Sequence, residues 1–160
     1  QKERVFTFLD PERDPLGTAY HAIQSQIAVG SGGLLGKGFG QGSQSQLDFL
    51  PEQQTDFVFS VLGEEWGFVG SAVVLALYLG ILIRGLMIAH SSKDQFGSYL
   101  AVGVVALFFW AGLINVGMVI GVVPVVGVPL PMLSYGGSAL LTCMIALGLL
   151  MNVSMRRYVF

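Results

Sequence analysis

Three carboxylates spaced by four residues, Asp48, Glu52 and Asp56, stand just before the first long apolar segment. Asp56 is the strongest candidate for chemistry. With a reference pKa of about 3.9 its side chain is ionised at neutral pH and could accept a proton as a general base. The ordinary alternative is an acidic residue in the first turn of a helix, where the helix dipole favours it. The residues alone leave both interpretations open.

The same three carboxylates could hold a divalent cation such as Mg²⁺ or Mn²⁺, because these ions prefer carboxylate oxygens. Pro51 argues against one continuous helix that would place all three on one face. The alternative is a set of solvated loop acids, so a cation is a possibility that the sequence does not decide.

Lys37 lies in a glycine-rich run, residues 30–42, which invites a phosphate-loop interpretation. That interpretation fails, because a Walker A motif needs glycine where Ser31 stands and serine or threonine where Gly38 stands. The remaining possibilities are a flexible or tightly turned loop and a loop that brings Lys37 to an anionic ligand.

Two further acids, Glu64 and Glu65, stand inside the first apolar segment. Charges within a membrane span are costly and usually face protein or water. Asp56, Ser60 and Glu64 share one helical face, which predicts either a wet, outward-facing cavity or a membrane boundary near Trp66.

Small and polar residues within the apolar segments predict close helix packing. Asn115 is expected to form an interhelical hydrogen bond, and the pairs Gly63/Gly67 and Gly117/Gly121 have the GxxxG spacing of tightly packed membrane helices.

The elements that position these residues follow from composition. Of the 160 residues, 53% are hydrophobic and 11% charged, against about 25% charged in soluble domains. We predict an all-α, polytopic membrane protein with transmembrane helices at about 57–83, 97–123 and 137–155, and a large extracytoplasmic loop at 1–56. No basic patch is present, which argues against a nucleic-acid partner.

Charge asymmetry predicts the orientation. Residues 1–70 carry a net charge of −5 and residues 71–160 a net charge of +3. Arg84 and Lys93 follow the first span, and Arg156 and Arg157 follow the third, so both places are expected in the cytoplasm. The acidic first segment then lies outside.

Within the outer segment, Thr18 could cap a short interfacial or re-entrant helix at about 19–29. The chain begins at Gln1 without an initiator methionine, so we expect it to be a fragment of a longer protein.

Several motifs occur in order along nearly the whole chain: FLDPERDPLG at 8–17, IAVGSGG at 27–33, LPE at 50–52, TDF at 55–57, GEEWG at 63–67 and SYGGS at 134–138. These motifs resemble the SEDS family of bacterial membrane proteins. Within that family, DPERDPL at 10–16 and PVVGVPLP at 124–131 look more like the RodA branch of cell elongation than the FtsW branch of division.

The resemblance implies a ten-helix inner-membrane protein, of which this chain is roughly the last three helices and the preceding outer loop. It implies a peptidoglycan glycosyltransferase that polymerises lipid II beside a class B penicillin-binding protein, with Asp56 deprotonating the acceptor sugar's 4-hydroxyl. Expected substrate contacts are Gln24, Ser25, Lys37, Asp48, Glu52 and Ser134.

Two alternatives remain at this point, a lipid II flippase and a non-catalytic scaffold of the cell-wall complex. We expect the fragment alone to be inactive, because the resemblance places much of the substrate cavity on upstream helices.

Overall fold

The computed structural model describes residues 18–42 and 55–156, and every regular element in these ranges is an α-helix. The predicted all-α class is confirmed. Asp48, Glu52 and the motif at 8–17 lie outside the described residues. The helices are α2 (Thr18–Ser31), α4 (Val58–Ser91), α5 (Gln95–Val119) and α6 (Gly137–Arg156).

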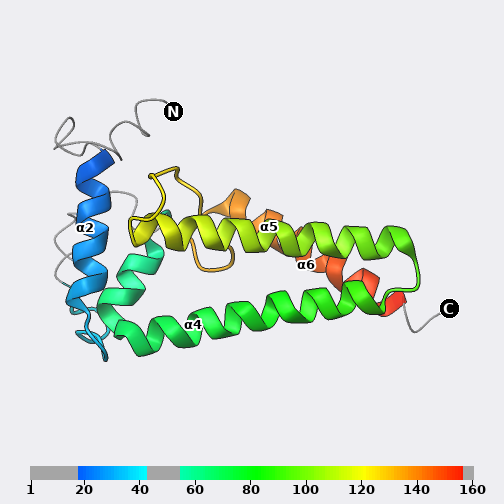
Figure 1. Cartoon of the computed structure of the whole chain (residues 1–160), viewed down its shortest axis with the longest axis horizontal. Helices are drawn as coiled ribbons and strands as arrows, with labels where there is room; N and C mark the ends of the chain where they lie inside the picture. Colours follow the sequence, from blue (N-terminus) through cyan, green and yellow to red (C-terminus); the bar gives the residue numbers. More distant parts are fainter. Residues whose placement is uncertain (1–17, 43–54, 157–160) are drawn as a thin grey trace.

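Three of these helices, α4, α5 and α6, are long and apolar enough to cross a membrane. α4 and α5 run antiparallel as a hairpin, and α6 packs against both (Figure 1). Their shared core contains small and branched side chains from all three helices, namely Leu82, Ala89, Ala101, Val104, Val105, Phe108, Cys143, Ala146, Leu150 and Val153. Small residues in this core let the helix backbones approach closely.

The helix ends differ from the predicted spans. α4 continues past the predicted end at residue 83 to Ser91, and α5 begins at Gln95, where the Asp94 carboxylate accepts from the backbone N–H groups of Phe96 and Gly97. Arg84 therefore lies on a helix and not in a loop. A charged residue suits the edge of the bilayer, but it does not stop helical hydrogen bonding.

At its other end α5 stops at Val119, four residues before the predicted limit of 123. Gly121 adopts a positive φ of 78°, and its N–H donates to Met118 O while the N–H of Val122 donates to Gly117 O. These two bonds form a Schellman motif, which satisfies the last carbonyls of a helix. Gly121 therefore ends α5, which corrects its predicted place within a helix, while the predicted close packing at Gly121 is present, against the Gln26 side chain of α2.

The predicted short helix at 19–29 is present as α2, which crosses the end of the bundle where α4 begins and α5 ends (Figure 1). Ser25 is fully buried there, and its hydroxyl donates to Val119 O at 3.0 Å. Gly63 faces Val29, and a Cβ added to Gly63 would lie 3.2 Å from Val29 Cγ2. Close packing at Gly63 is thus present, with α2 as the neighbour.

Candidate functional site

Asp56 lies in the turn that leads into α4, at the end of the bundle covered by α2. The helix begins two residues later at Val58, so Asp56 lies just before the N-cap residue Phe57 and not in the first turn, and the helix dipole still favours a carboxylate at this end. Its side chain is partly exposed, and a Cβ added to Gly127 would lie 3.0 Å from Asp56 Oδ2. The carboxylate therefore rests against the backbone of the segment that joins α5 to α6.

That joining segment, residues 120–136, is linked to the turn at Asp56 through the Asn115 side chain. The amide nitrogen Nδ2 of Asn115 donates to Asp56 O at 2.9 Å and to Val128 O at 2.7 Å. Asn115 is fully buried. The sequence predicts a hydrogen bond between helices, whereas Nδ2 donates to backbone carbonyls in two connecting segments.

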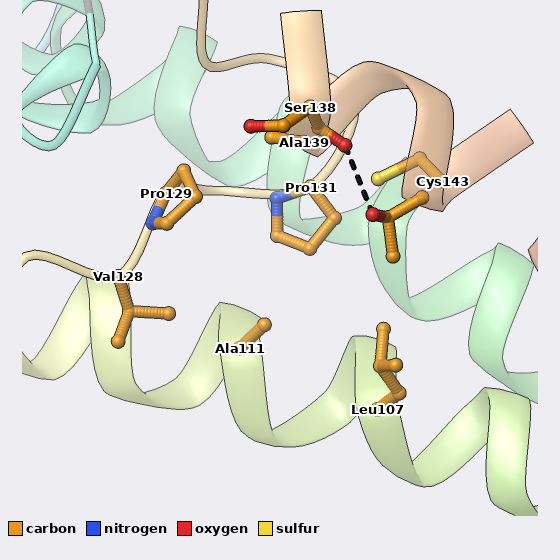
Figure 2. A pocket seen from close by; sticks show the side chains of 9 residues that line it. Leu107, Ala111, Val128, Pro129, Pro131, Ser138, Ala139 and Cys143 are labelled. Atoms are coloured by element: carbon orange, nitrogen blue, oxygen red, sulfur yellow. Dashed lines mark hydrogen bonds between the residues drawn. The ribbon is translucent and has the colours of Figure 1, made fainter. Parts of the chain in front are cut away.

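The proline-rich part of the joining segment crosses above α5, as Figure 2 shows for Val128, Pro129 and Pro131. A mostly apolar cavity of about 290 Å³ lies beneath it, between Leu107 and Ala111 of α5 and the start of α6. Proline fixes φ, so this segment has little conformational freedom. It therefore forms a fixed surface against which the Asp56 carboxylate lies.

A second feature of this end is a break in α4 at Gly67, whose φ of 65° and ψ of −163° are not helical. The break leaves carbonyls and N–H groups without helical partners, and the glycine-rich loop supplies them. Lys37 N donates to Glu64 O and Gly38 N to Glu65 O, both at 3.0 Å. In return, Phe68 N donates to Gly33 O at 2.9 Å, and Val69 N donates to Leu34 O. Irregular backbone within a membrane helix is tolerated where other protein groups hydrogen-bond to it in this way.

The same loop neutralises the buried acid of α4. Lys37 Nζ forms a 2.8 Å ion pair with Glu64 Oε1, and the Glu64 side chain is 0% exposed. Glu65 Oε1 accepts from Gly40 N at 3.1 Å. A buried carboxylate is costly unless it is paired, so Glu64 faces protein and not a wet cavity. The Lys37 ammonium thus lies at the break in α4, and its contact with an anionic ligand stays a prediction.

The other predicted substrate contacts are placed as follows. Gln24 is partly exposed on α2. The Ser25 hydroxyl is used in packing α2 on α5, and the Ser134 hydroxyl accepts from Leu130 N at 2.7 Å, closing the turn before α6. Both serines have structural hydrogen bonds. Substrate binding by these residues, as by Asp48 and Glu52 outside the described ranges, stays a prediction.

The cation also stays a prediction. Among residues 18–42 and 55–156, no three His, Cys, Asp or Glu side chains gather closely enough to hold a metal ion. Two members of the carboxylate cluster, Asp48 and Glu52, are outside those ranges.

Sequence reasoning missed the contribution of Asn115 and Gly127 to this site. A lone asparagine in an otherwise apolar span was a signal, since a polar side chain there must find a partner. Nothing in the sequence pairs residue 115 with residues 56 and 128, which are distant along the chain.

Three helices long and apolar enough to cross a membrane, one of them broken where a glycine-rich loop hydrogen-bonds to it, define a polytopic helical membrane protein. The sequence matches the profile of the cell cycle protein family of FtsW, RodA and SpoVE over residues 1–159. The chain belongs to this family, which confirms the resemblance seen in its motifs.

Curated relatives agree with this assignment. The chain is 54% identical over 157 residues to the peptidoglycan glycosyltransferase MrdB of Escherichia coli K12, covering 98% of the chain and 42% of the relative. It is 50% identical over 157 residues to the peptidoglycan glycosyltransferase RodA of Treponema pallidum, covering 98% and 36%. It is 47% identical over 152 residues to stage V sporulation protein E of Bacillus subtilis, covering 95% and 41%. The chain therefore spans less than half the length of these relatives.

Solved structures give the same fold. One comes from work on the structural coordination of polymerization and crosslinking by a peptidoglycan synthase complex. The match covers 99% of the present chain and 42% of the solved chain, with a TM-score of 0.76 and 35% identity. Another, an aspartate-to-alanine mutant of the rod shape determining protein RodA from Thermus thermophilus, matches 67% and 36%, with a TM-score of 0.63 and 38% identity.

Proposed function

We propose that the full-length parent of this chain is a peptidoglycan glycosyltransferase that polymerises lipid II into glycan strands during cell elongation. Family membership and relatives named as peptidoglycan glycosyltransferases support the activity. The structural observation that carries the proposal is the place of Asp56: a partly exposed carboxylate held between the start of α4 and the proline-rich joining segment.

In the proposed reaction, Asp56 accepts the proton of the acceptor sugar's 4-hydroxyl. The freed oxygen attacks the anomeric carbon of the donor, and the bond to undecaprenyl pyrophosphate breaks with inversion. A base must lie within hydrogen-bond reach of the proton that it removes. A carboxylate fixed against two backbone segments suits that requirement, because little motion is needed before transfer.

Orientation in the membrane is part of the proposal. Lys93, in the turn between α4 and α5, and Arg156, at the end of α6, lie at one end of the bundle, and Asp56 lies at the other (Figure 1). The positive-inside rule then supports residues 1–56 in the extracytoplasmic space and the C-terminus in the cytoplasm. Asp56 would face the side on which lipid II head groups are joined.

This orientation predicts a labelling pattern in spheroplasts carrying full-length protein with Cys143 changed to alanine. Tyr135→Cys, in the joining segment, should react with a membrane-impermeant maleimide added outside. Gln95→Cys, at the opposite end of α5, should react only after permeabilisation. Both positions are exposed, so accessibility does not bias the comparison. The reverse labelling pattern would refute the proposed orientation.

For partners, we propose lipid II, a class B penicillin-binding protein that supplies crosslinking, and membrane lipid. A solved structure similar to this chain comes from a peptidoglycan synthase complex, which supports such an assembly.

The test of function is lipid II polymerisation by the purified full-length parent with its penicillin-binding partner, read as glycan strands on a gel. The partner carries an inactivated transpeptidase serine, so crosslinking does not obscure strand length. We expect strands that disappear when the parent protein is omitted. A folded complex that makes no strands but moves lipid II across liposomes would identify a flippase. A folded complex that does neither would identify a scaffold.

A further inference from the structure

The Asn115 side chain, within the apolar helix α5, hydrogen-bonds to backbone outside its own helix. It is 0% exposed, and its Nδ2 donates to two backbone carbonyls, those of Asp56 and Val128. The Asp56 carbonyl lies just before α4, and the Val128 carbonyl lies between α5 and α6. The Asn115 side chain therefore links the turn that carries Asp56 to the proline-rich segment.

The orientation of the Asn115 amide follows from these partners. Two carbonyl oxygens need a donor, and only the NH₂ group of the amide provides two N–H bonds. In the described part of the chain, Oδ1 of Asn115 is buried and accepts no hydrogen bond. An unsatisfied buried acceptor carries a free-energy cost. The amide is therefore oriented so that Nδ2 makes both hydrogen bonds while Oδ1 makes none.

Gly127 completes the arrangement on the side-chain face of Asp56. It precedes Val128, has a φ of 75°, and lies so that an added Cβ would be 3.0 Å from Asp56 Oδ2. The backbone that Asn115 holds through Val128 is thus the same backbone that the carboxylate touches. A shift of this segment changes the position of the carboxylate directly.

We propose that Asn115 is a positioning residue for Asp56, and that it acts with Gly127 to hold the carboxylate in the geometry for removing the acceptor proton. The inference rests on the proposed function. Asn115 acts through the backbone of residues 56 and 128, and it has no substrate contact in this role. Its loss should therefore lower turnover and leave substrate affinity almost unchanged.

The test uses the full-length parent with its penicillin-binding partner and purified lipid II, and compares Asn115→Ala, Gly127→Ala and the control Asn152→Ala. Asn152 is an exposed asparagine of α6. For Asn115→Ala we expect kcat to fall about 10- to 100-fold, the range that a displacement of about 1 Å can cause, with KM within about twofold. Gly127→Ala should show the same pattern, because its methyl group meets the carboxylate. Asn152→Ala should match the wild type.

Several outcomes would overturn the positioning role. One is a folded Asn115→Ala protein with wild-type kcat, and another is a loss confined to KM. If Asn115→Ala does not fold, the test rests on Gly127→Ala, whose position is exposed on the surface. Wild-type kcat in Gly127→Ala then refutes the proposal. Full activity of Asp56→Asn would remove the proposed base as well. An inactive Asp56→Asn beside fully active Asn115→Ala and Gly127→Ala would refute the positioning role alone.

Discussion

Replacing Asp56 with asparagine in the full-length parent should reduce lipid II polymerisation to about 1% of wild type or less, since a positioned general base contributes about 10²–10⁴-fold. Asparagine has nearly the shape of aspartate but no carboxylate to accept the acceptor proton. The measurement is the initial rate of glycan formation with the penicillin-binding partner present. Asp56→Ala should be equally inactive.

This substitution keeps the contact between Asn115 and the backbone of residue 56. Asn115 bonds to the backbone carbonyl of Asp56 and not to its carboxylate, so the clamp between residues 56 and 128 survives in both variants. Thermal stability and partner binding should therefore match the wild type. Loss of activity together with loss of folding would not support a catalytic role, which is why both are measured.

Asp94→Asn is the matched control for the same chemical change. Asp94 lies at the opposite end of the bundle and caps α5, and asparagine caps helices as well as aspartate does. This variant should keep full activity and stability. Retained polymerisation by Asp56→Asn, with a contaminating polymerase excluded, would remove Asp56 from the chemistry.

The helical framework was predictable because its signals are local. Long apolar segments without charge indicate membrane spans, and prolines and glycines between them indicate connections. The ends were less accurate, since α4 runs on to Ser91 beyond Arg84 and α5 stops at a Schellman motif around Gly121. Hydropathy reports where lipid begins, whereas helix ends depend on capping bonds.

The candidate site was predictable only in part. Asp56 stood out through the TDF motif and its place before the first span. The roles of Asn115 and Gly127 depend on contacts between residues distant in sequence, and no local pattern encodes such contacts. Glu64 was seen as a costly charge, but its partner Lys37 is 27 positions away along the chain.

The break in α4 was missed because its sequence signal had a simpler interpretation. Gly63 and Gly67 have GxxxG spacing, which predicts close packing of intact helices. In the structure Gly67 leaves the helical conformation, and the loop that docks there hydrogen-bonds the released backbone groups. A helix of this composition gives no sign of a break until the docking loop is considered with it.

Gly36→Ala should therefore be among the most destabilising single-methyl changes in the chain. Gly36 has a φ of 81°, and an added Cβ would overlap the backbone oxygen of Glu65, so the loop must shift relative to the broken helix. Left-handed backbone costs about 1–2 kcal/mol for an L-residue, and overpacking adds about 1–3 kcal/mol. We expect a clearly lowered melting temperature of the full-length protein in detergent, and faster proteolysis within the glycine-rich loop.

Two neighbouring glycines separate the causes. Gly40→Ala meets no atom within 4 Å but also has a positive φ, of 71°, so only the conformational cost of about 1–2 kcal/mol should appear. Gly30→Ala, within α2, meets no atom within 4 Å and has ordinary helical geometry, so alanine should be neutral or mildly stabilising. The predicted order of stability is Gly30→Ala, then Gly40→Ala, then Gly36→Ala. Equal stability of the last two would mean that the close approach of Gly36 to the Glu65 backbone is not maintained in the full-length protein.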